Sequence, residues 1–329
     1  MSVRAQQGVA LVTALVIVAL TATAAALLIN QQQLHIRRSA NLFNSEQAQQ
    51  YVLGAEAWAM RTLSQDRLDN DVDSLNEDWA TVLPPIDIPG GAVTGYIVDL
   101  QGALNLNGLL KSGKVDAIAL ERTQRLLGYA ELDGGSVVQA LIDWLDANIE
   151  PAGPGGAEDD FYLGLEQPYR AANRPMVSIS ELRLVRGVTD EAYIRLVLQN
   201  PEQGEDGAPL ALLRPLVFAL PDPTPINVNT APVPVLMALG LDQSAAEEIV
   251  KARADAPFKS VEEFLRHSAV ADTDLAKKQD QAADLSVNSS YFLLVAEARI
   301  DRARAPLFSV LRREQNGIMH VLMRSQGTF

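Results

Sequence analysis

The 329-residue sequence predicts an α+β fold with a long N-terminal helix, a small antiparallel sheet and a large all-helical block inserted into the sheet. Three observations support this prediction. An uncharged apolar run near the N-terminus continues into a stretch of good helix formers. Strand-like segments occur before the middle of the chain and again at its C-terminus. Between them, apolar residues recur at helical spacing.

The N-terminal helix is the strongest local signal. Residues 9–29 form an apolar run without a charge, long enough to span a bilayer at about 1.5 Å per residue. Arg4 precedes this run and favours a cytoplasmic N-terminus. Residues 30–61 contain no proline and only one glycine, Gly54, so helix formation continues. We therefore expect one helix over residues 9–62, with residues 9–29 in a membrane.

A secretory signal peptide is the competing interpretation of this segment. It would end in a small-residue cleavage site such as Ala22-Thr23-Ala24. The apolar run is longer than a usual signal-peptide core, and the helical pattern does not break after it. A plain signal anchor is the other alternative.

The predicted sheet begins with a strand at Val93–Leu100 and ends with a C-terminal meander. The meander comprises Tyr291–Ile300, Leu307–Glu314 and Ile318–Arg324, with turns expected at 304–306 and 316–317. The preceding stretch, 66–89, is acidic and turn-rich, and Pro84-Pro85 is expected to break regular structure. Residues 63–101 and 285–329 together form the predicted α/β core.

Residues 102–284 form the predicted helical block. A proline-rich linker, 199–225, divides it into two sets of helices. The expected helices are 120–129, 136–147, 179–185 and 191–198, followed by 230–239, 244–253 and 260–267.

The two sets of helices carry a weak internal echo. Leu104–Asn107 is similar to Ile226–Asn229, and residues 176–182 are similar to 258–264. Within the second pair, Ser178 with Glu181 and Ser260 with Glu263 fit helix capping boxes. We interpret the echo as two related helical motifs that pack together.

Composition excludes several kinds of site. The chain has no cysteine, which removes disulfides and thiolate metal sites, and its three histidines are far apart in sequence. Its formal net charge of −14 repels nucleic acid at long range. It carries no G-x-S-x-G, H-E-x-x-H or P-loop motif, and aromatic residues are only 5%. We expect a protein that is not an enzyme, although acid pairs such as Asp143 and Asp146 occur in glycoside hydrolases.

Residues 226–268 resemble the helix-hairpin-helix of DNA-uptake proteins. Those hairpins present backbone N–H groups to phosphate through two glycines. Here the hairpin is Gly240-Leu241-Asp242, so a carboxylate replaces the second glycine. Acids also outnumber bases from Ile226 to Arg266, by six to four. We expect no nucleic-acid partner, and interpret the motif as a protein-docking or packing element.

The start of the chain resembles the type IV prepilin signal. A short basic leader, residues 1–8, ends in Gly8 and is followed by the apolar helix. The resemblance implies that a prepilin peptidase cleaves between Gly8 and Val9, leaving Val9 as a site for N-methylation. In that family the fifth mature residue is a glutamate, whose carboxylate neutralises the terminal amine of the neighbouring subunit ahead. This chain has Thr13 there.

Loss of that glutamate in so long a chain resembles the K-type minor pseudopilins of type II secretion systems. The resemblance covers the full length. It implies a protein at the tip of the periplasmic pseudopilus, initiating or capping its assembly for protein export across the outer membrane. It also implies a single-pass inner-membrane anchor, a periplasmic body, and I-type, J-type and other pseudopilins as partners. The alternative is a membrane-anchored periplasmic binding or scaffold protein outside any pilus.

An acidic segment lies within the helical block. Between Arg125 and Arg170 there are nine acidic residues and no basic one. Clustered carboxylates on a flexible loop suit Ca²⁺, which prefers oxygen ligands, although a solvated acidic face is the alternative. The K-type resemblance implies Ca²⁺ in this domain, as one or two ions. The candidate ligands are Asp143, Glu158, Asp159 and Glu181.

Overall fold

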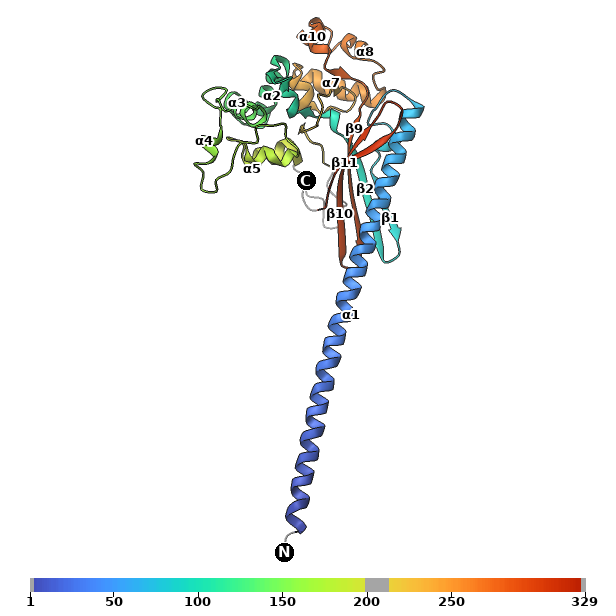
Figure 1. Ribbon diagram of the computed structural model, residues 1–329. Helices are drawn as coiled ribbons and strands as arrows, with labels where there is room; N and C mark the ends of the chain where they lie inside the picture. The colour runs from blue at the N-terminus through green and yellow to red at the C-terminus, as the bar shows by residue number, and fades with distance from the viewer. Residues whose placement is uncertain (1–2, 199–212, 327–329) are drawn as a thin grey trace.

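The computed structural model describes residues 3–198 and 213–326, and its longest element is helix α1, Val3–Asp69. Figure 1 shows α1 as a stalk that projects far from a head, with the sheet packed only along its C-terminal part. The helix continues beyond its predicted end at residue 62. Leu63, fully buried against the head, and an ion pair between Arg67 and Asp71 stabilise this last stretch.

The head contains a five-stranded antiparallel sheet in the order β1-β2-β9-β10-β11. Its strands are β1 Leu83–Ile88, β2 Gly91–Asp99, β9 Tyr291–Ile300, β10 Ala303–Arg313 and β11 Met319–Ser325. Segments that precede and follow the helical block therefore pair in one antiparallel sheet. Helix α1 covers one face of it, where Val52, Trp79 and Phe292 are buried.

Two predictions about proline were wrong. Pro84 and Pro85 do not end regular structure but lie in the edge strand β1, where the register is irregular between Leu83 and Ile86. The turn expected at 304–306 lies inside β10, and the chain reverses at Asp301 and Arg302 instead. Proline is tolerated at position 306 because β11 pairs with β10 only from Phe308 onward, leaving an open edge.

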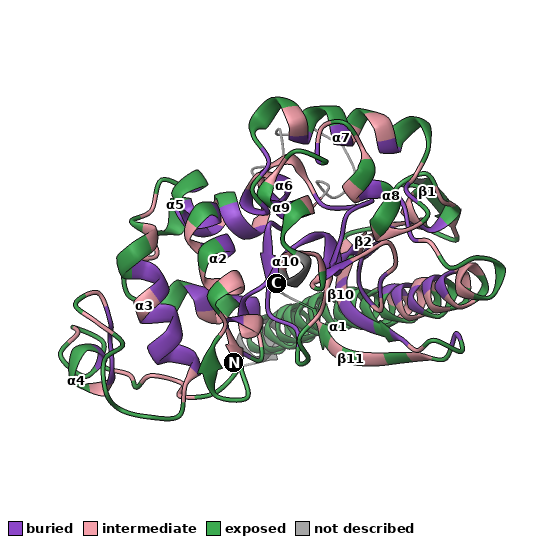
Figure 2. Cartoon of the chain, turned by 90° about the horizontal axis from the view of Figure 1, so that it is seen from above, coloured by how far each residue is buried: buried purple, intermediate pink, exposed green. Residues whose placement is uncertain are grey.

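The helical block packs on the opposite face and the upper end of the sheet (Figures 1 and 2). Its first set comprises α2 Ala117–Tyr129, α3 Gly134–Leu145, α4 Asp159–Tyr162, a 3₁₀ helix Ile179–Leu184, α5 Asp190–Tyr193 and a π-helical turn Ile194–Leu198. Its second set comprises α6 Val233–Ala238, α7 Gln243–Asp255, α8 Val261–Arg266, α9 Asp274–Lys277 and α10 Gln279–Ala282. Residues 199–212 of the predicted linker lie outside the described residues.

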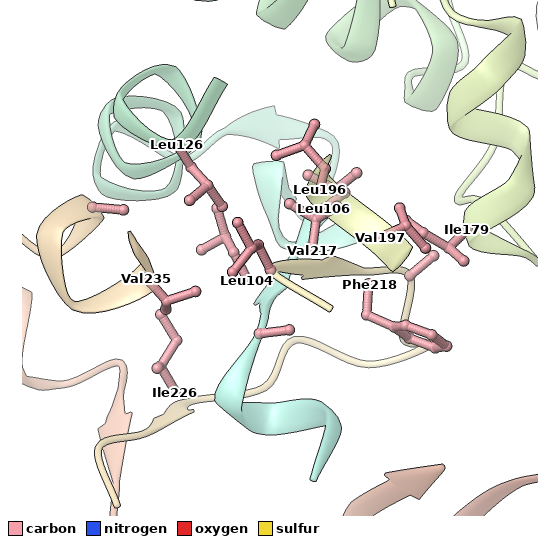
Figure 3. Close-up of a cluster of buried hydrophobic side chains, with 14 of the residues drawn as sticks. Leu104, Leu106, Leu126, Ile179, Leu196, Val197, Val217, Phe218, Ile226 and Val235 are labelled. Carbon is pink, nitrogen blue, oxygen red and sulfur yellow. The ribbon is translucent and has the colours of Figure 1, made fainter. Parts of the chain in front are cut away.

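One hydrophobic core joins the two sets of helices. Figure 3 shows Leu126 of the first set and Val235 of the second converging on it, together with Leu106, Val217 and Phe218 from the segments beside them. The same core continues onto the sheet face opposite α1 through side chains of β2, β9 and β10. The block is therefore packed onto the sheet rather than tethered to it.

Each set of helices lies in sequence between the two strands of a short parallel pair. Strand β3, Leu104–Asn105, pairs with β6, Val217–Phe218. Strand β7, Ile226–Asn227, pairs with β8, Leu285–Ser286. A separate small hairpin joins β4, Leu110–Lys111, to β5, Lys114–Val115.

The sequence echo corresponds to a repeated hydrogen-bonding device. The amide of Asn107 donates to the carbonyl of Met176 at 2.9 Å and accepts from its N–H at 2.8 Å. The amide of Asn229 makes the equivalent pair with Phe258, at 2.9 Å in both directions. Each asparagine thus fixes the chain just before a short helix.

The capping boxes that follow differ between the two copies. Ser178 and Glu181 form a complete box. Ser260 accepts from the N–H of Glu263, but the Glu263 carboxylate accepts from the N–H of Lys259 rather than from that of Ser260. The predicted box is therefore complete in the first copy and shifted by one residue in the second.

Candidate functional site

The N-terminal half of α1 is an exposed apolar rod. Every residue from 9 to 43 is exposed, and Val9, Leu20 and Phe43 are each more than 60% accessible. Within the described residues, α1 is the one helix long and apolar enough to cross a membrane, with a mean hydropathy of 2.5 over its most apolar window. So much apolar surface is unfavourable in water, so this half of α1 requires a bilayer or other helices around it.

Thr13 presents no charge on this rod. Its hydroxyl donates to the carbonyls of Val9, at 3.1 Å, and Ala10, at 3.0 Å, within the same helix. A side chain satisfied by its own helix adds no polar group for a neighbouring helix to pair with. Gly8 and Val9 lie within α1, and cleavage between them stays a prediction.

The acidic segment is organised around Asp143 on α3. Asp143 is fully buried, and its carboxylate accepts hydrogen bonds from the N–H groups of Ala152 at 2.7 Å and Ala157 at 2.6 Å. The loop that follows α3 thus folds back over the helix. Gly156 is required at this point, because a Cβ there would lie 2.3 Å from a carboxylate oxygen of Asp143.

Glu158 is the most unusual carboxylate in this region. It is only 5% exposed, and neither of its carboxylate oxygens has a hydrogen-bond partner. Its pKa is raised to about 7, chiefly by burial and also by the charges of Asp143, Asp146 and Asp159. A buried carboxylate with both oxygens free among like charges fits a bound cation, and oxygen-only ligands suit Ca²⁺.

The other two candidate ligands have partners already. Asp159 is paired with Arg170 at 2.5 Å and accepts from the N–H of Ala171 at 3.1 Å. Glu181 accepts from the N–H of Val177 at 2.8 Å and from the indole N–H of Trp144 at 3.2 Å.

Asp143, Asp146 and Asp159 are the charged neighbours of Glu158, but no three of these four carboxylates have ligand atoms within 4.8 Å of one another; Glu181 has a capping role. Sequence reasoning did not select Asp146 as a ligand. The signal for it was its position three residues after Asp143, which places both carboxylates on one side of the same helical turn.

A second acidic group lies at the junction of stalk and sheet. Within residues 3–198 and 213–326, Asp66, Asp73 and Glu77 are the one set of acid, histidine or cysteine side chains with ligand atoms within 4.8 Å of one another. Arg313 pairs with Asp66 at 2.8 Å and with Asp73 at 2.5 Å, and Trp79 donates to Glu77 at 2.6 Å. The group is therefore an ion-pair network with its own internal cation.

The helix-hairpin-helix-like part carries a capping carboxylate at its hairpin. Asp242, which replaces the second glycine, caps α7 by accepting from the N–H of Ala245 at 2.8 Å. Its carboxylate thus occupies the position where a helix N-terminus would otherwise attract an anion. Gly240 retains the left-handed conformation, with φ 108°, that the tight turn requires.

Comparison with known proteins agrees with the stalk, the sheet and the two sets of helices. Two family models described as type II secretion system (T2SS), protein K, match residues 102–197 and 226–288. The type II secretion system protein K of Pseudomonas aeruginosa is 38% identical over 336 residues, covering 98% of this chain and 94% of the relative. That of Aeromonas hydrophila is 32% identical over 344 residues, covering 99% and 98%.

A solved structure shares the fold. A chain of the crystal structure of the GspK-GspI-GspJ complex from enterotoxigenic Escherichia coli matches with a TM-score of 0.74 and 25% identity, covering 89% of this chain and 100% of that chain. The chain described here therefore belongs to the type II secretion system protein K family and is a minor pseudopilin of that system.

Proposed function

We propose that this protein is the tip subunit of the pseudopilus and initiates or caps its assembly. The observation that carries the proposal is Thr13, an uncharged residue whose hydroxyl is bonded within its own helix. A subunit with another subunit ahead of it needs a carboxylate here to neutralise that subunit's terminal amine. A subunit placed first has no such neighbour.

The shape of the head supports the same position. The helical block widens the molecule at the end opposite the N-terminus (Figure 1). Because the block is packed onto the sheet through a shared core, it is a rigid obstruction. It would hinder a further subunit from adding above this one.

The partners follow from the solved relative, which assembles with GspI and GspJ. We propose that this chain binds the I-type and J-type minor pseudopilins through the exposed apolar surface of α1. Packing of α1 against partner helices would cover side chains such as Leu34, Ile36 and Phe43, which are each more than 60% exposed.

Membrane placement and processing belong to the same proposal. Residues 9–29 anchor the chain in the inner membrane, and the remainder lies in the periplasm. A prepilin peptidase removes residues 1–8 by cleavage after Gly8, which makes Val9 the new N-terminus and the site of N-methylation. The role is structural, without catalysis.

We further propose that Ca²⁺ binds beside α3 with Glu158, Asp143, Asp159 and Asp146 as carboxylate ligands. The free oxygens of the buried Glu158 support this. The ion would neutralise the like charges and hold the loop of residues 146–158 against the helix.

Co-purification tests the functional proposal directly. The full-length protein is co-expressed with the I-type and J-type minor pseudopilins, extracted in detergent and analysed by size-exclusion chromatography with light scattering. We expect one complex that contains all three proteins. Elution of this protein alone, while the I-type and J-type proteins elute together, would favour a scaffold outside any pilus.

A further inference from the structure

A cavity lies where the sheet, the loop after α1 and the second set of helices meet. Its volume is about 290 Å³. Its apolar wall includes Leu75, Val233 and Val250, and two arginines, Arg214 and Arg253, also line it. In a chain with a net charge of −14, a cavity with two guanidinium groups is unexpected.

In the described part of the chain, neither arginine has an acidic partner. Within the described ranges, 3–198 and 213–326, no carboxylate lies within 4.0 Å of Arg214 or Arg253, whereas the buried Arg122 and Arg313 are both paired. Arg253 is 6% exposed and donates one hydrogen bond, from Nη1 to the carbonyl of Val228 at 2.6 Å. Its other guanidinium nitrogens donate to no group in the described part of the chain.

The two charges also act on one another. The pKa of Arg253 is lowered to about 10, chiefly by burial and also by the positive charge of Arg214. Leaving a nearly buried cation without a counter-ion costs free energy, and a neighbouring like charge adds to that cost. An anion between the guanidinium groups would relieve both effects.

One carboxylate, Asp99, lines the cavity but cannot serve as the counter-ion. Its oxygens accept from the side chains of Asn227, Thr230 and Ser289, at 3.0, 2.6 and 2.6 Å, and from the N–H of Gln101 at 2.8 Å. These four hydrogen bonds are made to groups other than the two arginines. Among the described residues that line the cavity, no other side chain carries a carboxylate.

We propose that this cavity binds one carboxylate carried on an apolar body, held between Arg214 and Arg253. The cavity is at the lower end of the size range of ligand pockets, enough for a side chain and its neighbour but too small for a nucleotide or a lipid. The negative net charge also disfavours polyanions. Arg214 is exposed and lies at the entrance, whereas Arg253 lies inside.

The competing interpretation is that Arg253 only stabilises the turn at Val228. That role needs the hydrogen bond to the carbonyl but neither Arg214 nor the apolar wall. Binding measurements on Arg214 variants therefore separate the two interpretations, and because Arg214 is exposed its replacement leaves the core packing intact.

Calorimetric titration of the full-length protein in detergent tests the proposal. The probes are N-acetyl-leucine, which carries a free carboxylate, and N-acetyl-leucinamide, its neutral analogue. We expect binding of the acid only, weakened at least tenfold by Arg214→Ala and several-fold by Arg253→Lys, which keeps the charge but loses the planar donor pair. Arg266→Ala, which removes an exposed arginine of α8, is the matched control and should leave affinity unchanged.

A third probe, N-acetyl-leucyl-glutamic acid α-amide, has its C-terminus blocked and carries its carboxylate on the glutamate side chain. Tighter binding of this probe would assign the site to an acidic side chain of a protein, and tighter binding of N-acetyl-leucine would assign it to a chain terminus or a free acid. Equal heats for the acid and the neutral analogue, or full affinity in Arg214→Ala, would overturn the proposal. The measurement uses the protein alone, so its result is independent of pseudopilus assembly.

Discussion

The guanidinium group of Arg313 lies 2.5 Å from the carboxylate of Asp73, and both side chains are 1% exposed. Arg313 ends β10, and Asp73 belongs to the loop that follows α1. The same guanidinium donates to the carbonyls of Leu63, at 3.0 Å, and Ser289, at 2.9 Å. One side chain thus joins the end of the stalk to the sheet.

Replacing Arg313 should destabilise the head severely. Arg313→Met leaves the buried Asp73 carboxylate without its cation, and removing one partner of such a pair costs about 3–5 kcal/mol. Urea unfolding of the full-length protein in detergent, followed by tryptophan fluorescence, measures the loss. Arg195→Ala is the control, because its pair with Glu131 is exposed and should contribute about 0–1 kcal/mol. Equal losses in the two variants would contradict the role given to Arg313.

Stability should fall as pH rises from 5 to 8 when Ca²⁺ is removed with EDTA. Burial raises the pKa of Glu77 and of Glu158 to about 7, and that of Asp99 to about 6. A folded-state pKa above the unfolded value means that stability is fully present below the unfolded pKa, near 4. It is lost as pH rises through 6 and 7, where these buried groups become charged.

Carboxylates with lowered pKa values affect stability in a different pH range. Glu56 and Glu297 are both paired with arginines, and their contribution to stability is lost only as pH falls below their ordinary pKa values. Urea titrations at pH 5, 6, 7 and 8 measure the slope, and Glu77→Gln and Glu158→Gln should each reduce it. A free energy of unfolding that is constant or rises over this range would show that these groups are not held as described.

Calcium should raise the melting temperature through Glu158. Binding at 100 times the dissociation constant stabilises by about 2.7 kcal/mol, or roughly 5–10 °C for a head of this size. Glu158→Gln should abolish the rise, and in EDTA at pH 7.5 it should be more stable than the wild type because it removes a buried charge. Glu181→Gln should lower stability through its cap and Trp144 but retain the rise. If millimolar Ca²⁺ left the melting temperature of the wild type unchanged, the result would contradict the metal proposal.

Gly156→Ala should damage the same region by sterics alone. The added Cβ would lie 2.3 Å from the Asp143 carboxylate and 3.0 Å from the carbonyl of Gly153. The loop must then move away from α3, lowering both the melting temperature and the response to Ca²⁺. Gly128→Ala is the control, because nothing lies within 4 Å of its Cβ and alanine favours the helix α2 by about 0.5–1 kcal/mol. A Gly156→Ala protein as stable as the wild type would contradict the close packing of this loop.

The elements that could be predicted are those with long, uninterrupted patterns. The apolar run of α1 and the helix formers that follow it favour a helix over any other structure. The segment Tyr291–Ile300 favours a strand in the same way, and the predicted bounds coincide with those of β9. Prolines were misread because their effect depends on a neighbouring strand. Pro84 and Pro306 are tolerated only because the strand edge beside each is open, and sequence does not show which edges pair.

The candidate site could be predicted only where charge is clustered along the chain. Asp143, Glu158 and Asp159 were selected from one acidic segment, and Asp143 and Asp159 are among the charged neighbours of Glu158. Glu181 fitted both a ligand and a capping-box partner by sequence, and its contacts follow the second. Arg214 and Arg253 were missed because they meet only after two separate segments fold onto one cavity.

The proposed position of this subunit at the tip rests on the uncharged residue Thr13. Thr13→Glu restores the carboxylate that neutralises the terminal amine of a subunit ahead, so the variant should enter the filament at internal positions. Thr13→Gln, similar in size but uncharged, is the matched control and should behave as the wild type. Both variants are compared by their distribution along pseudopili. Identical distributions for Thr13→Glu and Thr13→Gln would show that the charge does not set the position.

Immunogold labelling of the wild-type protein on isolated pseudopili tests the central claim most directly. A tip subunit predicts gold at one end of each filament and none along the shaft. Gold distributed along the shaft would contradict the claim, because it would mean that further subunits add above this one despite Thr13 and the helical block.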